Sequence, residues 1–231
     1  MNSSLSSNVS TGSLFGRVMM MLTGSMAVAA LGAFVGGSII TSGIALLVIG
    51  IIWLLGTFGV AYAAKKVDDG AMEPAVGIGI MGVWMFFSGL FIGPALAHYV
   101  AVLGGSTVML AFLGTSGVMA GCGAIGVLSG RNFSGLGKFL SIALLGLILV
   151  GIVNIFVAFS TGVEIAYCLI GMAIFAGFFI VDFFRIKENA NSDSWGGAMM
   201  ITMSLYLDFV NFLLFFLRLL EIFLGKGDSK K

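Results

Sequence analysis

Charged residues are scarce in this chain. Asp, Glu, Lys and Arg together make up only 9% of its 231 residues, whereas 59% are hydrophobic. An ordinary soluble domain carries about 25% charged residues, and a short chain has too much surface to bury so many apolar side chains in a soluble core. A lipid bilayer, which accepts long apolar runs, is the remaining environment. The net charge of +1 provides no basic surface, so we expect the bilayer as a partner and no nucleic acid.

The chain also lacks the residues of common catalytic and metal sites. It has one histidine and two cysteines, Cys122 and Cys168, and both cysteines lie within apolar runs. The phosphate-binding loop G-x-x-x-x-G-K-[ST], the zinc motif H-E-x-x-H and the nucleophile motif G-x-S-x-G are absent. We therefore expect neither an enzyme nor a resident cofactor, and we interpret the cysteines as small buried residues.

Polar and charged breaks divide the chain into seven apolar segments, at residues 18–40, 44–64, 75–97, 108–128, 139–160, 164–184 and 197–224. Each interior segment has about 20 residues, enough for a helix to cross a hydrocarbon core of about 30 Å. The sequence thus predicts an all-α integral membrane protein with seven transmembrane helices in residues 18–224. We expect residues 1–17 to be a disordered cytoplasmic tail and residues 225–231 a charged carboxyl-terminal tail.

Lysine and arginine occur in alternate connections between these segments. The connections after the first, third and fifth segments contain neither. Arg17 precedes the first segment, and the other connections hold Lys65, Lys66, Arg131, Lys138, Arg185 and Lys187. Cytoplasmic loops are enriched in these residues, so the pattern predicts a cytoplasmic amino terminus. Seven crossings would place the three lysines of the carboxyl-terminal tail on the opposite side, against the same rule.

Glycine spacing predicts where helices approach closely. Three pairs are separated by four residues, namely Gly32 and Gly36, Gly89 and Gly93, and Gly117 and Gly121. Small residues at this spacing let helix backbones come together in lipid. Pro94 lies inside the third segment and should kink it or leave a backbone carbonyl without its hydrogen bond.

Two aspartates lie inside apolar segments, where an ionisable group is costly and often functional. Asp182 is near the end of the sixth segment and Asp208 is inside the seventh; both segments end at one loop, so the helices are antiparallel neighbours. Two carboxylates close together in lipid share a proton or bind a cation. The alternative is a helix–helix hydrogen bond that only fixes packing. Ser204 and Asn211 share a helix face with Asp208 by spacing, so we expect them to support a cation or proton site at the two acids.

The residues around these acids resemble the Bax inhibitor-1 family, also called the transmembrane Bax inhibitor motif family. Residues 204–218 resemble its final helix, and residues 92–96, 111–118 and 131–137 resemble further motifs, the last of bacterial members. The resemblance spans about residues 65–224. It implies seven helices with the last surrounded by the other six. It also implies a pH-sensitive calcium leak with Asp182 and Asp208 as pH sensor and metal site, in a bacterial inner (plasma) membrane.

The chain departs from this resemblance at one position. In such family members an arginine near the start of the third span holds the acid pair, whereas residues 73–77 here read Glu-Pro-Ala-Val-Gly. The leading hypothesis is nevertheless a passive, pH-sensitive cation leak, with calcium as the ion. The alternative is an interaction protein that modulates a membrane protease or a survival pathway through a membrane protein partner. A proton-coupled transporter is less favoured, because the sequence shows no inverted pair of broken helices.

Overall fold

The computed structural model describes residues 14–225. This part of the chain forms helices and no strand: α1 (Leu14–Ile39), α2 (Gly43–Asp68), α3 (Pro74–Leu103), α4 (Gly105–Leu128), α5 (Ser134–Phe156), α6 (Thr161–Glu188) and α7 (Trp195–Leu224). Six of them, α1 to α6, are long and apolar enough to cross a membrane. The predicted all-α integral membrane fold with seven helices is therefore confirmed.

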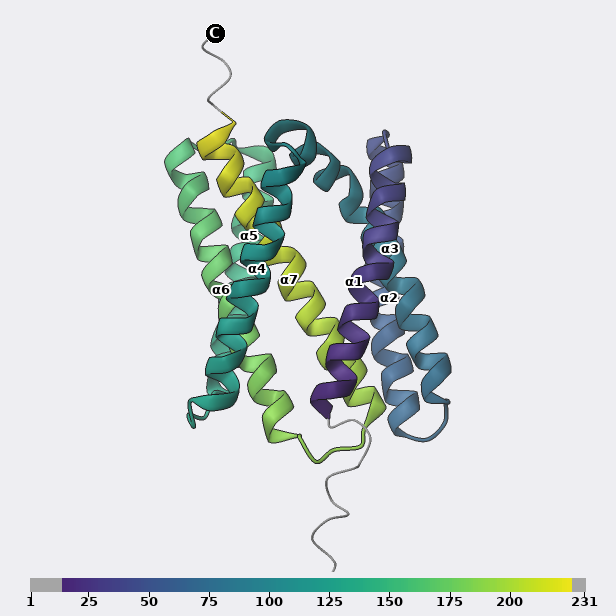
Figure 1. The fold of residues 1–231 in the computed structure, drawn as a ribbon. Helices are drawn as coiled ribbons and strands as arrows, with labels where there is room; N and C mark the ends of the chain where they lie inside the picture. Colours follow the sequence, from purple (N-terminus) through teal and green to yellow (C-terminus); the bar gives the residue numbers. More distant parts are fainter. Residues whose placement is uncertain (1–13, 226–231) are drawn as a thin grey trace, which may run out of the picture.

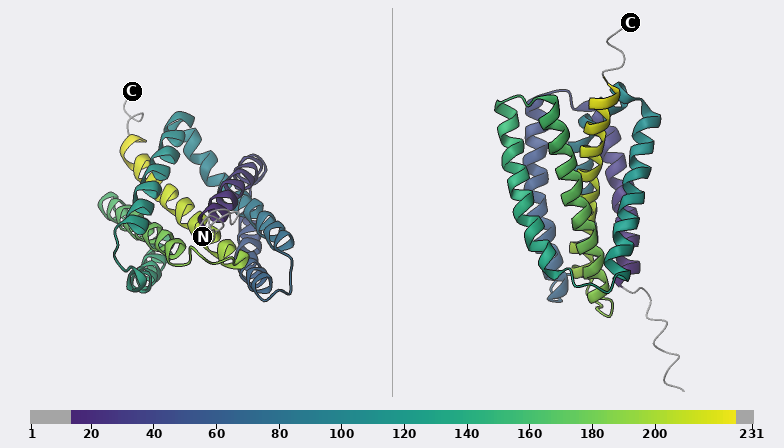
Figure 2. Two further views of the ribbon diagram at one scale, coloured as in Figure 1. Left: turned by 60° about the horizontal axis from the view of Figure 1, so that its bottom comes forward. Right: turned by 90° about the vertical axis from the view of Figure 1, so that its left-hand side faces the viewer.

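Helix α7 runs obliquely through the middle of the bundle, with α1 to α3 on one side and α4 to α6 on the other (Figure 1). It packs against α1, α2, α3, α4 and α6, and the views of Figure 2 place it at the centre. Within residues 14–225, α5 contacts α6 and does not contact α7. The last helix is thus surrounded by five helices rather than by the six that the resemblance implied, because α6 lies between α5 and α7.

Burial follows this arrangement. In α7 the side chains of Leu205, Tyr206 and Leu217 have no exposed area, whereas α2 exposes 76% of Ile44 and 69% of Phe58. Apolar side chains that face lipid need no protein partner, so a peripheral helix can remain apolar on its outer side. Helix α7 is therefore well shielded from lipid, whereas α2 exposes apolar side chains to it.

Glycines bring α1 and α3 into backbone contact, as their spacing predicts. A Cβ atom on Gly32 would collide with the carbonyl oxygen of Phe86, and one on Gly89 would collide with that of Ala29. The prediction for Gly117 and Gly121 is wrong, because no atom lies within 4 Å of a Cβ built there.

Helix α4 instead approaches α6 through Gly126, where a Cβ would lie 2.5 Å from the carbonyl oxygen of Ile180. A spacing of four residues is found on every face of a helix, so it does not say which face meets a neighbour.

Several helix boundaries differ from the predicted ones. Helix α1 begins at Leu14, so residues 14–17 are helical, and residues 1–13 of the predicted disordered tail lie outside the described residues. Helix α6 continues to Glu188, which places Arg185 on the helix rather than in the loop. Pro94 stays within α3, whose second half crosses toward α4 (Figure 1).

The first and last described residues lie at opposite ends of the bundle (Figure 1). We term the end that holds the α6–α7 connection and the start of α1 the loop end. The other end is the C-terminal end. Of the predicted tail at 225–231, residues 226–231 lie outside the described residues.

Candidate functional site

The structure brings the two intramembrane acids together. Asp182 on α6 has no exposed area and Asp208 on α7 is 6% exposed. Their carboxyl groups are close enough to interact through a hydrogen bond. The short loop between α6 and α7 makes the helices antiparallel neighbours, and each helix directs one acid into the contact. We term Asp182 and Asp208 the acid pair.

A guanidinium group compensates one of these carboxylates. Arg185 Nη1 donates a hydrogen bond of 3.0 Å to Asp182 Oδ1, and its side chain remains 53% exposed. The two residues are three apart on α6, which places them on neighbouring positions of one helix face. The cation therefore comes from α6 itself, and the start of α3 has no arginine.

Two oxygen atoms of the acid pair remain without a donor. Asp182 Oδ2 and Asp208 Oδ2 are buried and have no hydrogen-bond partner among residues 14–225. A buried acceptor without a donor costs about 1 to 3 kcal/mol, and more when it is charged. A shared proton or a bound cation would satisfy these atoms, so the arrangement suits either one.

Ser204 and Asn211 have different surroundings, although they lie on one stripe of α7. The Ser204 side chain is close enough to Asp182 to interact through a hydrogen bond. Asn211 Nδ2 instead donates to the carbonyl oxygen of Leu207 on its own helix, at 2.8 Å. Of the two predicted supporting residues, only Ser204 contacts the acid pair in the described structure.

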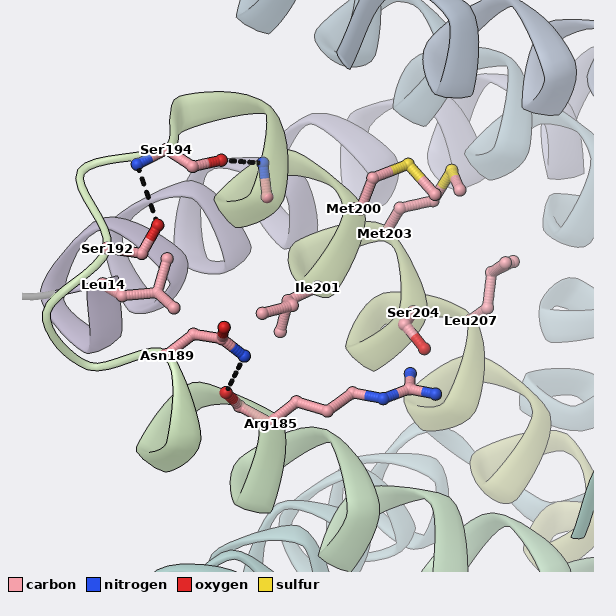
Figure 3. Close-up of a pocket in the computed structure, with 11 residues that line it drawn as sticks. Leu14, Arg185, Asn189, Ser192, Ser194, Met200, Ile201, Met203, Ser204 and Leu207 are labelled. Carbon is pink, nitrogen blue, oxygen red and sulfur yellow. Dashed lines mark hydrogen bonds between the residues drawn. The ribbon is translucent and has the colours of Figure 1, made fainter. Parts of the chain in front are cut away.

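A cavity of about 590 Å³ opens at the loop end beside the acid pair, and we term it the vestibule (Figure 3). Its lining includes Arg185 from α6, Asn189 directly after that helix, and Ile201, Ser204 and Leu207 from α7. Figure 3 shows the Arg185 side chain extending toward Ser204 and Leu207. Since Arg185 and Ser204 both neighbour Asp182, the acid pair lies directly behind the vestibule wall.

The loop end of α7 is anchored by α2. Asp68 Oδ1 accepts hydrogen bonds from the Gly196 amide at 2.9 Å and from the Ser194 hydroxyl at 2.8 Å. Ser194 Oγ also accepts from the Gly197 amide and caps the helix. The first amides of a helix have no partner within it, so these contacts fix where α7 begins.

Helix α1 anchors the α6–α7 connection just before α7. Arg17 pairs with Asp193 at 3.1 Å and lies over the Trp195 ring at 4.8 Å. This contact and that of Asp68 join α1 and α2 to the start of α7, the helix that carries Asp208.

A second charged cluster lies near the C-terminal end. Arg218 on α7 pairs with Glu164 on α6 at 2.8 Å and with Glu221 at 2.6 Å. Glu221 also contacts the single histidine, His98 on α3, at 2.8 Å. Sequence reasoning did not find this cluster, because its members are up to 123 residues apart.

Arg185 was also missed as a site residue, since its charge was interpreted only as a marker of the cytoplasmic side. The separation of three residues from Asp182 was a usable signal, because residues at this spacing are neighbours on a helix. A helix boundary placed before Arg185 concealed it.

No resident metal centre is apparent in the described part of the chain, where no three His, Cys, Asp or Glu side chains converge. The residues that could hold a cation are Asp182 and Asp208, with the hydroxyl of Ser204 as a further ligand. Calcium takes six to eight oxygen ligands, so water and backbone carbonyls would have to complete the shell.

Comparison with known proteins identifies relatives along most of the chain. The family described as "Inhibitor of apoptosis-promoting Bax1" matches residues 12–225. An uncharacterised protein of Lactococcus lactis is 38% identical over 148 residues, 62% of this chain and 60% of that protein. An uncharacterised membrane protein of Streptococcus pyogenes serotype M1 is 31% identical over 184 residues, 77% of this chain and 73% of that protein.

An uncharacterised membrane protein of Vibrio cholerae is 32% identical over 145 residues, 61% of this chain and 63% of that protein. The chain therefore spans about 60% of the length of the Lactococcus and Vibrio relatives. The family match includes all seven helices and both members of the acid pair. The chain belongs to the family of inhibitors of apoptosis-promoting Bax1, as the resemblance to Bax inhibitor-1 proteins predicts.

Proposed function

We propose that the protein is a passive, pH-sensitive leak for cations, with calcium as the ion, in a bacterial inner (plasma) membrane. The observation that carries this proposal is the buried acid pair behind the vestibule wall, with one oxygen of each acid unpartnered. Two adjacent carboxylates outside water need a proton or a cation between them. The proposal assigns the chain no catalytic activity.

In this proposal the proton of the acid pair acts as the gate. While the pair holds a proton, Arg185 compensates the remaining charge on Asp182 through the 3.0 Å contact. Loss of the proton leaves two negative charges facing each other, which favours entry of a cation from the vestibule. Alkaline pH should therefore increase the flux, and acidic pH should reduce it.

Arg185 would have to move during passage, because it lies between the vestibule and Asp182. Its side chain is 53% exposed, so water in the vestibule can solvate the guanidinium group when it leaves the carboxylate. An arginine remains charged at any physiological pH, so the acids rather than Arg185 would sense pH.

The experiment is a flux assay in liposomes that contain a calcium-sensitive dye. The purified protein is reconstituted, calcium is added outside, and dye fluorescence is followed from mildly acidic to mildly alkaline pH. The proposal predicts calcium entry above that of protein-free liposomes, with a rate that rises with pH. Equal rates with and without protein at every pH would contradict it.

A second candidate is regulation of a membrane protease or survival pathway through helix contacts. It draws on α2, which packs only against α3 and α7 within the described residues and exposes apolar side chains such as Leu47 and Phe58. Lipid accounts for the same exposure, so the leak is preferred. Crosslinking in membranes separates them: a stoichiometric partner still captured by an Asp182→Asn, Asp208→Asn double variant would favour the second.

A further inference from the structure

A second cavity lies on the other side of the acid pair, toward the C-terminal end. Its volume is about 270 Å³, and we term it the outer cavity. Helices α3, α5, α6 and α7 contribute polar side chains to its lining, namely Tyr99, Asn154, Glu164, Tyr167, Asn211 and Arg218. Four helices thus contribute polar groups to this cavity, whereas the sides of the bundle that face lipid are apolar.

One stripe of α7 lines both cavities. Ile201, Ser204 and Leu207 line the vestibule. Asn211 and Arg218 line the outer cavity. These positions follow one another at intervals of three, four or seven residues, which keeps them on one face of a helix. The cavities are therefore arranged in series along α7.

A single helical turn separates the two linings. Leu207 and Asn211 are four residues apart, which corresponds to about 6 Å along the axis. The Asn211 amide donates to the Leu207 carbonyl oxygen across this turn. Asp208 lies within the same turn, and it places the acid pair between the cavities.

We propose that the vestibule and the outer cavity are the two halves of one cation path, closed in this conformation by the α7 turn from Leu207 to Asn211. This inference rests on the proposed leak for its use, but its geometry can be tested without any flux. A cation on this path would leave water over only about 6 Å. The carboxylates of the acid pair could replace its hydration at that point.

The test is the accessibility of single cysteines to a membrane-impermeant, positively charged methanethiosulfonate reagent. The native thiols are first removed as Cys122→Ala and Cys168→Ala. Ser204→Cys and Ile201→Cys probe the vestibule, and Asn211→Cys and Leu214→Cys probe the outer cavity. The orientation of the protein in the vesicles is determined with two further variants. These are Asn191→Cys, exposed in the α6–α7 loop, and Ser106→Cys, exposed at the start of α4.

The inference predicts that the vestibule probes react only with reagent on the loop side and the outer-cavity probes only with reagent on the opposite side. Leu145→Cys, at a position 62% exposed on the outside of α5, should react from neither side because lipid covers it. If Asn211→Cys and Leu214→Cys react with reagent on the loop side, or if neither of them reacts, the inference is overturned. Two probes for each cavity guard against one variant that fails to fold. If the labelling pattern is as predicted but the liposome assay shows no flux, the proposed leak is rejected. The arrangement of the two cavities on either side of the α7 turn is then retained.

Discussion

At the scale of single residues, Asp182 depends on Arg185 for a compensating charge. The 3.0 Å contact joins a side chain with no exposed area to one that borders the vestibule. A cation that approaches the acid pair from the vestibule therefore meets a positive charge first. At an effective dielectric constant of about 20, two unit charges about 8 Å apart interact by about 2 kcal/mol.

We accordingly expect Arg185→Gln to raise calcium flux by about tenfold or more at alkaline pH, where the acid pair has lost its proton, because the repulsion of about 2 kcal/mol is removed. Lys187→Gln is the matched control, since it removes the same charge from an exposed position two residues further along α6. Both variants are measured in the liposome assay. Equal effects of the two substitutions would show that general surface charge, and not the contact with Asp182, controls entry.

At the scale of helices, the contact between α1 and α3 depends on glycines that leave no room for a side chain. We expect Gly89→Ala to lower the free energy of unfolding by about 1 to 3 kcal/mol, as overpacking does, because its Cβ would collide with the Ala29 carbonyl oxygen. Gly82→Ala on the same helix is the control, since no atom lies within 4 Å of its Cβ. Denaturant unfolding in detergent micelles provides the measurement. A loss of similar size in Gly82→Ala would place the effect in the helix itself.

The anchoring of α7 by α2 leads to a second prediction at this scale. Asp68→Ala removes the acceptor of the Gly196 amide and of the Ser194 hydroxyl, and should cost about 1 to 2 kcal/mol of unfolding free energy, in the range for lost helix caps. Asp69→Ala removes the same charge one residue later and serves as the control. The same unfolding assay compares the two. If Asp69→Ala is as destabilising as Asp68→Ala, the capping contact contributes nothing specific.

The sequence predicted where helices form better than it predicted which face of each helix meets a neighbour. Seven apolar runs and two acids at one loop were sufficient for the helix count and for the meeting of Asp182 with Asp208. Asn211 lies on the same face of α7 as Ser204. The residues that each of them contacts nevertheless differ, because the tilt of α7 across the bundle decides which helix lies beside each of its turns. The ion pairs of Arg218 and the anchoring by Asp68 join distant segments, and local spacing contains no signal for such contacts.

At the scale of the whole molecule, the two ends of the described chain lie at opposite ends of the bundle (Figure 1). The loop end holds the start of α1 and the α6–α7 connection, and we propose that it faces the cytoplasm because lysine and arginine gather there. In intact cells, Ser106→Cys should therefore react with an impermeant thiol reagent, whereas Asn191→Cys should react only after permeabilisation. Both are placed in the background without native cysteines. The reverse pattern would invert the proposed orientation.

The central claim is that Asp182 and Asp208 act as one titrating unit that controls cation passage. Calcium flux is measured against pH for the wild type, Asp182→Asn, Asp208→Asn and the double variant in the same liposomes. Either substitution removes the repulsion between the two charges, so each single variant should lose the pH dependence and resemble the double variant. Residues that act as one unit give such non-additive effects. Independent, additive effects of the two substitutions would contradict the account and leave the acids with a packing role.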